Sequence, residues 1–270
     1  MRIYISADIE GITGVVHGDQ CNITGAGEYQ RARLQMTREV SAAAQGFFNS
    51  GASEVICNDS HGSMRNILIE ELHPEVRLIS GSPKHLSMME GINDQFDAVA
   101  FIGYHAKNGD RGVLSHTISG GTVFEIRING KPASEAVINA AIAGDFNVPV
   151  ILLTGDQTIC SDVKQDLGKI ETVTVKEAIT RYSALNLPTD EACQLIETAA
   201  KRAYGRIGEL KPFIPSRPVI LELVCLNSGL ADNASRCPGS ERIDGRTLRC
   251  SGNNFLEAFR ILRTMIALAN

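Results

Sequence analysis

Apolar segments of strand length recur along the first 160 residues, and helical patterns separate them. They are rich in Ile, Val, Leu and Ala and cover residues 2–7, 54–57, 97–103 and 149–154. Residues 28–49 have the spacing of an amphipathic helix, and Gly51 is its natural terminator. Strands that alternate with helices are typical of a parallel sheet covered by helices. The sequence therefore predicts an α/β fold with Rossmann-like layers, that is, a mostly parallel sheet flanked by helices.

Weaker patterns fill the rest of this region. Short helices are predicted over 66–72 and from Pro83 towards Glu90, with an extended segment at 77–80. Residues 124–128 alternate and meet Asn129-Gly130, a strong hairpin signal, and Ser134 can cap a following helix. We expect residues 1–160 to form one metal-binding α/β domain.

The C-terminal part has fewer elements. It contains a predicted strand at 172–175, a helix at 189–204, a strand at 219–226 and a closing helix at 254–269. We expect residues 161–270 to form a smaller α+β part that possesses candidate surfaces for oligomer contacts.

Composition excludes several classes of protein. The net charge of −5 and the absence of a dense Lys/Arg cluster argue against a nucleic-acid partner. Apolar runs are far shorter than the ~20 residues of a membrane helix, and the N-terminus enters a strand without a signal-peptide region. The seven cysteines are scattered without a CxxC pair, which fits reduced thiols and excludes a zinc site built on thiolates. We therefore expect a cytoplasmic protein with no membrane partner.

Acidic and imidazole side chains follow the predicted strands. Asp8 and Glu10 come after the first strand, and His61 and His105 come just past two others. Ligands collect outside the carboxyl ends of strands in open α/β sheets, so these groups are expected to converge, and they are donors that suit zinc. Taken singly, each has an ordinary alternative: a turn acid, a ribose-binding acid or a surface histidine. Glu135 alone resembles a helix N-terminal acid.

Taken together, the sequence motifs around these residues resemble those of the zinc-dependent D-aminopeptidase family that is found with bacterial dipeptide-transport operons. The resemblance extends over most of the chain and includes, in family order, residues 4–14 (YISADIEGITG), 58–61 (NDSH), 72–75 (LHPE), 103–106 (GYHA), 112–117 (GVLSHT), 128–130 (ING) and Glu135 with Asn139-Ala140.

This resemblance implies a site and an activity. It implies two zinc ions per subunit, with Asp8 bridging, Glu10 and His61 completing one coordination sphere, and His105 and Glu135 completing the other. It makes His116, within Ser115-His116-Thr117, a catalytic group that is not a ligand. The implied reaction is removal of the N-terminal residue of short peptides, with D-residues favoured, by a zinc-activated hydroxide. It also implies a ring-like homo-oligomer.

Two other functions remain open from the residues alone. One is another dinuclear metallohydrolase, an amidase or a phosphoesterase, because similar ligands serve many reactions. The other is a metal-free Rossmann-like binding module in which Asp8 and Glu10 hold a ribose. The second alternative lacks its key motif, because Gly11-Ile12-Thr13-Gly14 does not have the G-x-G-x-x-G spacing.

Overall fold

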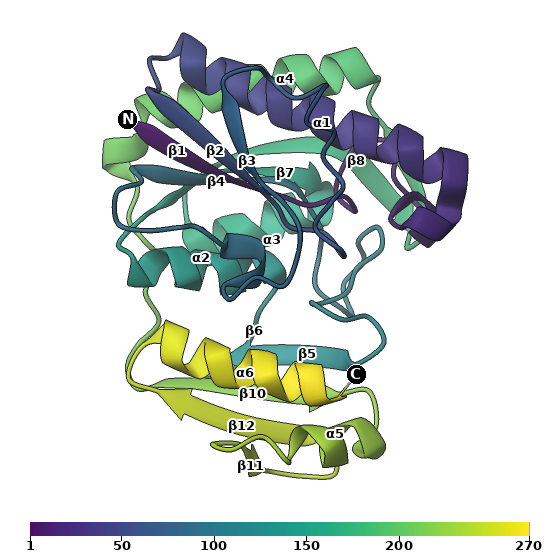
Figure 1. Cartoon of the computed structure of the whole chain (residues 1–270), viewed down its shortest axis with the longest axis vertical. Coiled ribbons are helices and arrows are strands. Elements are labelled where there is room, and N and C mark those ends of the chain that lie inside the picture. Colours follow the sequence, from purple (N-terminus) through teal and green to yellow (C-terminus); the bar gives the residue numbers. More distant parts are fainter. Residues whose placement is uncertain (270) are drawn as a thin grey trace.

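A seven-stranded sheet forms the larger half of the molecule in the computed structural model, which describes residues 1–269 (Figure 1). All neighbouring strands are parallel except the last pair, β8 and β9. The predicted mostly parallel sheet is thus confirmed. In spatial order the strands are β3 (Val76–Ile79), β2 (Glu54–Asp59), β1 (Arg2–Ala7), β4 (Ala98–Tyr104), β7 (Val150–Asp156), β8 (Glu171–Thr180) and β9 (Ser183–Asn186).

Helices cover both faces of this sheet. The helices α1 (Ala26–Asn49) and α4 (Thr189–Gly205) lie on one face, and α2 (Glu135–Asp145) and α3 (Gln157–Leu167) lie on the other (Figure 1). Alternation along β1 explains this arrangement. Ile3 and Ile5 belong to the hydrophobic core beneath α1 and α4, whereas Tyr4 belongs to the core beneath α2 and α3. The flanking helices predicted from the sequence are therefore confirmed.

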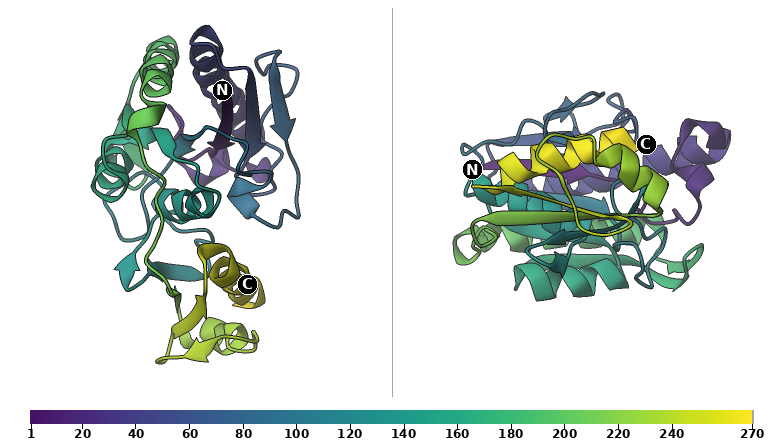
Figure 2. Two further views of the ribbon diagram at one scale, coloured as in Figure 1. Left: turned by 90° about the vertical axis from the view of Figure 1, so that its left-hand side faces the viewer. Right: turned by 90° about the horizontal axis from the view of Figure 1, so that it is seen from below.

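A second, antiparallel sheet lies beside the first at the other end of the molecule (Figure 2). The helix α6 (Phe255–Ala269) packs on its strands β10 and β12 and also contacts α2 of the first half. This helix therefore joins the two halves. In spatial order the strands are β11 (Glu241–Arg242), β12 (Thr247–Gly252), β10 (Val219–Cys225), β5 (Val123–Ile128) and β6 (Lys131–Pro132), and the short helix α5 is Ser228–Ala234.

The chain passes between the two sheets more than once. The predicted hairpin at Asn129-Gly130 is confirmed as β5–β6, yet it pairs with β10 of the second sheet. Conversely, β8, β9 and α4 follow residue 160 and belong to the first half. The division of the chain near residue 160 stays a prediction.

The two short helices predicted between β2 and β4 are wrong. Turns occupy the segment 61–72, where Ile67 and Leu72 are buried under α1, so their spacing reflects burial and not a helix. After Pro83 only a 3₁₀ turn forms, because Ser87 takes a positive φ of 52°. The 3₁₀ turns of the described chain are Gly18–Gln20, Ile23–Gly25, Ser87–Met89 and Ile207–Glu209.

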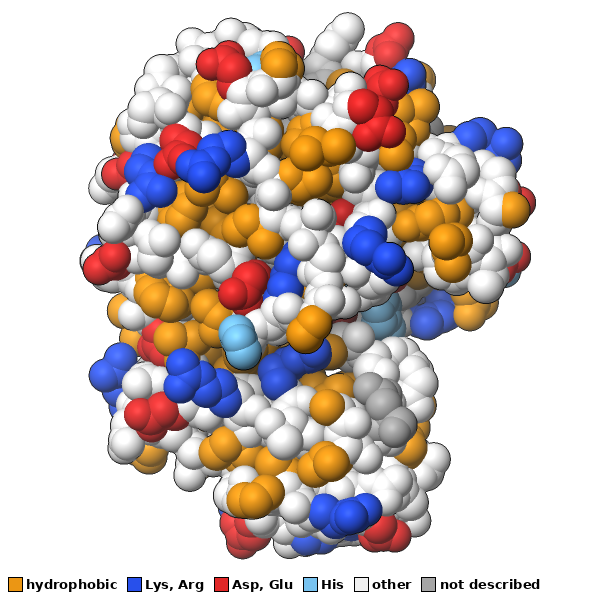
Figure 3. Space-filling view, in the orientation of Figure 1, with side chains coloured by type: hydrophobic (Ala, Val, Ile, Leu, Met, Phe, Trp, Pro, Cys, Tyr) orange, Lys and Arg blue, Asp and Glu red, His pale blue; other side chains and the backbone are white. Residues whose placement is uncertain are grey.

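One face of the molecule carries both signs of charge. Basic and acidic side chains are intermixed over the face seen in Figure 3, with apolar side chains between them. Among residues 1–269, no helix is both long and apolar enough to cross a membrane.

Candidate metal centre

The turn that bears Asp8 and Glu10 packs directly on the end of β4. The amide of Asp8 donates to Ile102 O at 2.8 Å, and that of Gly11 donates to Gly103 O at 2.8 Å. A Cβ at position 11 would lie only 2.0 Å from Tyr104 O, so the close approach requires glycine there. The packing fixes both carboxylates next to the residue that follows β4, His105.

A buried lysine fixes the same turn from the other side. The ammonium of Lys176, on β8, donates to the carbonyls of Glu10 (2.5 Å), Ile12 (2.9 Å) and Val15 (2.6 Å). These bonds use all three of its donors.

His61 follows β2 and is held by its neighbours. The Asp59 carboxylate accepts from the backbone N–H groups of Asn66 and Ile67, and the Asn66 amide donates to His61 O at 2.8 Å. Asp59 therefore shapes the loop and is not part of the cluster of donors. The Nε2 of His61 lies 2.7 Å from Cys21 O, and its Nδ1 faces the carboxylates.

Asp8 lies at the centre of the cluster. Its Oδ1 is 3.1 Å from His61 Nδ1, and its Oδ2 is 3.4 Å from His105 Nε2. Glu10 Oε2 approaches His61 Nδ1 at 2.9 Å, and Glu135 Oε1 approaches His105 Nε2 at 3.4 Å. All except the partly exposed His61 are buried. The side chains thus form two groups, each with one histidine, that share the Asp8 carboxylate.

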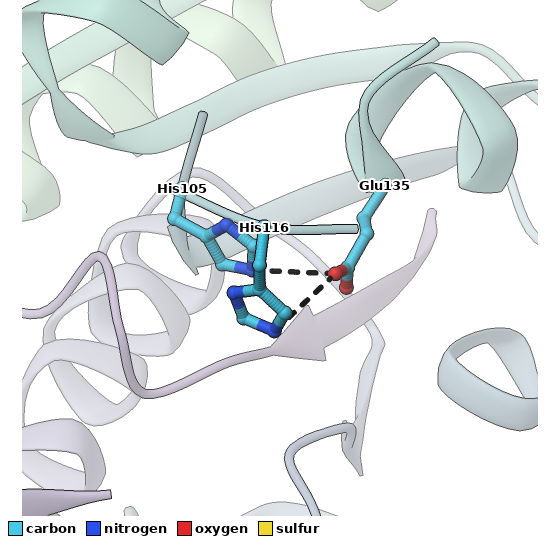
Figure 4. Close-up of side chains that lie close together, drawn as sticks. All are labelled: His105, His116 and Glu135. Atoms are coloured by element: carbon cyan, nitrogen blue, oxygen red, sulfur yellow. Dashed lines mark ion pairs between the residues drawn. The ribbon is translucent and has the colours of Figure 1, made fainter. Parts of the chain in front are cut away.

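Glu135 and His116 complete the cluster of side chains around Asp8. Glu135 is the first residue of α2, which Ser134 caps, and its Oε1 accepts from the Ile118 amide at 2.7 Å. His116 stacks on His105 with ring centroids 4.2 Å apart (Figure 4). Its Nε2 lies 3.8 Å from Glu135 Oε1 and 3.9 Å from Glu10 Oε1. His116 therefore lies beside the same group of carboxylates as the other two histidines.

Each of the three histidines directs one ring nitrogen at the carboxylates. One ring nitrogen of each faces a backbone carbonyl: Cys21 O for His61, Ala106 O for His105 and Leu114 O for His116. Because a carbonyl only accepts, that nitrogen holds the proton of the neutral ring, and the other nitrogen is free to bind a cation. A histidine that ligates a metal is commonly oriented in this way.

The charges in the cluster also fit a divalent cation. Burial, followed by the charge of Glu10, raises the pKa of Asp8 to about 7. The buried atoms Glu10 Oε2 and His105 Nε2 make no well-aligned hydrogen bond with any of residues 1–269, although each lies within ion-pair distance of a neighbour. Imidazole nitrogens and carboxylate oxygens are donors that zinc prefers, and a dication between them stabilises the ionised carboxylates. The residues present therefore fit a zinc centre.

The pKa of His116 shifts in the opposite direction to that of Asp8. Burial and the charge of neighbouring His105 lower it below its ordinary value. His116 is therefore neutral at physiological pH and can accept a proton at Nε2.

A cavity of about 170 Å³ opens over the cluster. Its lining includes Asp8, His61 and Glu135, here called its floor, and Phe259 and Arg263 of α6, here called its wall. The sequence analysis missed both wall residues, although their spacing of four residues places Arg263 on the helix face of Phe259.

The structure brings together every residue that was predicted for the site: Asp8, Glu10, His61, His105, Glu135 and His116. The other histidines, His17, His73 and His85, do not line the cavity. The roles of the six residues as ligands or catalytic group stay predictions.

Known proteins resemble this chain over its whole length. A family model described as D-aminopeptidase (Peptidase_M55) matches residues 1–264. A D-aminopeptidase of Bacillus subtilis strain 168 is 36% identical over 273 residues, which cover 100% of this chain and 98% of the relative. The solved structure of the Zn-dependent D-aminopeptidase DppA from Bacillus subtilis, described as a self-compartmentalizing protease, superposes with a TM-score of 0.96 at 36% identity, covering 100% of this chain and 98% of that one. The resemblance seen in the motifs is thereby confirmed, and the chain belongs to the D-aminopeptidase family.

Proposed function

We propose that this protein is a zinc-dependent aminopeptidase that removes the N-terminal residue, a D-residue by preference, from short peptides at a site for two zinc ions. The observation that supports it most is the position of Asp8, whose two oxygens face two different histidines at 3.1 and 3.4 Å. That arrangement suits a carboxylate that bridges two ions, with Glu10 and His61 on one side and His105 and Glu135 on the other. The zinc dependence and the preference for D-residues follow the names of the relatives.

The residues of the site have distinct tasks in this reaction. When bound, zinc supplies Lewis acidity, which lowers the pKa of water and polarises the scissile carbonyl. Carboxylates at the cavity floor attract the free amine of a peptide and so fix the cut to its first residue. His116, neutral because its pKa is lowered, can take up at Nε2 the proton that the attacking water loses and donate it to the leaving amine.

Metal analysis together with a substrate panel tests the proposal. We expect the purified protein to contain two zinc ions per subunit and to cleave D-Ala p-nitroanilide faster than L-Ala p-nitroanilide, with no turnover of a phosphate ester. Cleavage of the ester without cleavage of either amide contradicts the aminopeptidase function. One zinc ion per subunit at full activity contradicts the dinuclear site.

Assembly and location are further parts of the proposal. The relative DppA is described as self-compartmentalizing. In this chain the β8–β9 hairpin exposes Ile179 (70%), Tyr182 (57%) and Leu185 (65%) at the edge of the sheet, which suits contacts between copies in a ring-like homo-oligomer. The seven cysteines are free, which is consistent with the reducing cytoplasm. Size-exclusion chromatography with light scattering tests the assembly.

A further inference from the structure

Arg263 is a cation on the wall of the cavity, and none of the described residues 1–269 pairs with it. It lies on α6, half-buried, and it lines the same cavity as Asp8, His61 and Glu135. Its guanidinium makes no hydrogen bond or ion pair with any of residues 1–269, although Glu135 attracts it at longer range. A guanidinium has five donors and a high cost of burial, so one that residues 1–269 leave without a hydrogen bond beside a cavity points to an anionic group that enters from outside.

Glu135, the acid whose charge acts on Arg263, does not use these donors. It already accepts from the Ile118 amide and faces His105 at 3.4 Å. Burial lowers the pKa of Arg263, but an arginine stays protonated at any physiological pH. The lining of the cavity therefore combines a permanent positive charge with the proposed zinc ligands.

The size of the cavity limits which anion can reach this charge. At about 170 Å³ it is smaller than the ~300 Å³ at which sites for drug-sized ligands begin. In a dipeptide the terminal carboxylate carbon is only two bonds, about 2.5–3 Å of chain, beyond the scissile nitrogen. Each further residue moves it away by up to roughly 3.6 Å. A dipeptide is therefore the peptide whose carboxylate stays inside the cavity.

We propose that Arg263 binds the C-terminal carboxylate of the substrate and makes the enzyme selective for dipeptides with a free carboxyl end. The planar guanidinium forms two parallel hydrogen bonds to a carboxylate, which fixes the leaving half of the substrate while the carboxylates on the floor hold its amine. The inference rests on the proposed aminopeptidase function and extends it from short peptides to dipeptidase specificity.

The test compares two substrates that have the same scissile bond. The zinc-loaded enzyme is assayed on alanyl-alanine and alanyl-alaninamide, in the configuration that it prefers. We expect the wild type to favour the free acid, and Arg263→Gln to lose roughly ten- to one-hundred-fold in kcat/KM on the acid, mainly through KM, with the amide unchanged within a few-fold. Arg263→Lys keeps the charge without the planar fork and is expected to fall between the two.

Arg260 provides the matched control, because it lies exposed on the same helix. Arg260→Gln is expected to match the wild type on both substrates, and zinc content is measured in every variant. An equal loss on acid and amide in Arg263→Gln, or a wild type that cleaves the amide as well as the acid, overturns the inference and leaves the aminopeptidase function intact. A zinc-loaded wild type that cleaves neither substrate overturns the aminopeptidase function itself.

Discussion

Replacing Lys176 with methionine tests whether the buried ammonium fixes the turn of the metal centre. Methionine fills a similar volume but has no donor, so the carbonyls of Glu10, Ile12 and Val15 lose their partner. Hydrogen bonds to charged groups contribute about 1.5–3 kcal/mol each, which gives a gross loss of roughly 5–9 kcal/mol.

Removal of a buried charge offsets part of this loss. Burial lowers the pKa of Lys176 from 10.5 to about 8, which corresponds to roughly 3 kcal/mol of desolvation that the variant avoids. The expected net loss in the free energy of unfolding is therefore about 2–6 kcal/mol at pH 7. Because Glu10 lies on the released turn, zinc affinity should also fall by about tenfold or more.

Urea unfolding at pH 7 measures the first effect and zinc titration of the metal-free protein measures the second. Lys201→Met is the control, because Lys201 forms an exposed ion pair with Glu197 whose removal should cost less than about 1 kcal/mol. If Lys176→Met is no less stable than that control and binds zinc as the wild type does, the ammonium has no positioning role.

Further variants test individual residues. Asp8→Ala is expected to abolish activity and most bound zinc, because a bridging carboxylate serves both ions; zinc retained at wild-type stoichiometry in atomic absorption contradicts bridging. His116→Ala should keep its zinc while kcat falls by about 10²–10⁴-fold, and loss of zinc would reassign His116 as a ligand. Burial raises the pKa of Glu39 from 4.5 to about 7, so the folded state binds a proton that the unfolded state has released, and stability falls as pH rises through that window. Glu39→Gln should remove this loss and gain about 2–3 kcal/mol over wild type between pH 5 and pH 8 in urea unfolding, whereas parallel pH profiles would exclude the shifted carboxyl.

The sequence predicted the site better than it predicted the sheet order. His61 and His105 could be placed because every strand of a parallel sheet brings its carboxyl end to the same edge, whatever its position in the sheet. The pairing partners of a strand cannot be predicted in this way. The alternation of residues 124–128 shows that one face is buried, but it contains no information about the pairing of β5 with β10, which is about 90 residues away in the chain.

Residues that act through tertiary contacts were beyond the reach of sequence patterns. The sequence pattern around Lys176 predicts no special role for this residue. Only the fold shows that its ammonium reaches Glu10 O. The position of Arg263 in the cavity could not be predicted either, because a single cation on an amphipathic helix usually faces solvent. The false helix at 66–72 arose because the apolar residues of this segment, among them Ile67 and Leu72, are buried under α1 from a series of turns and not from a helix.

Because of the position of α6, the residues that select the peptide lie on a different part of the fold from the residues proposed to hold the ions. The proposed ligands come from loops of the large sheet and from the start of α2, whereas Phe259 and Arg263 come from a helix packed on the other sheet. A substitution on that helix can change which peptide is accepted while every donor to the ions keeps its place. Divergence in peptide preference among such enzymes is then expected to concentrate on this helix, with the residues that hold the ions unchanged.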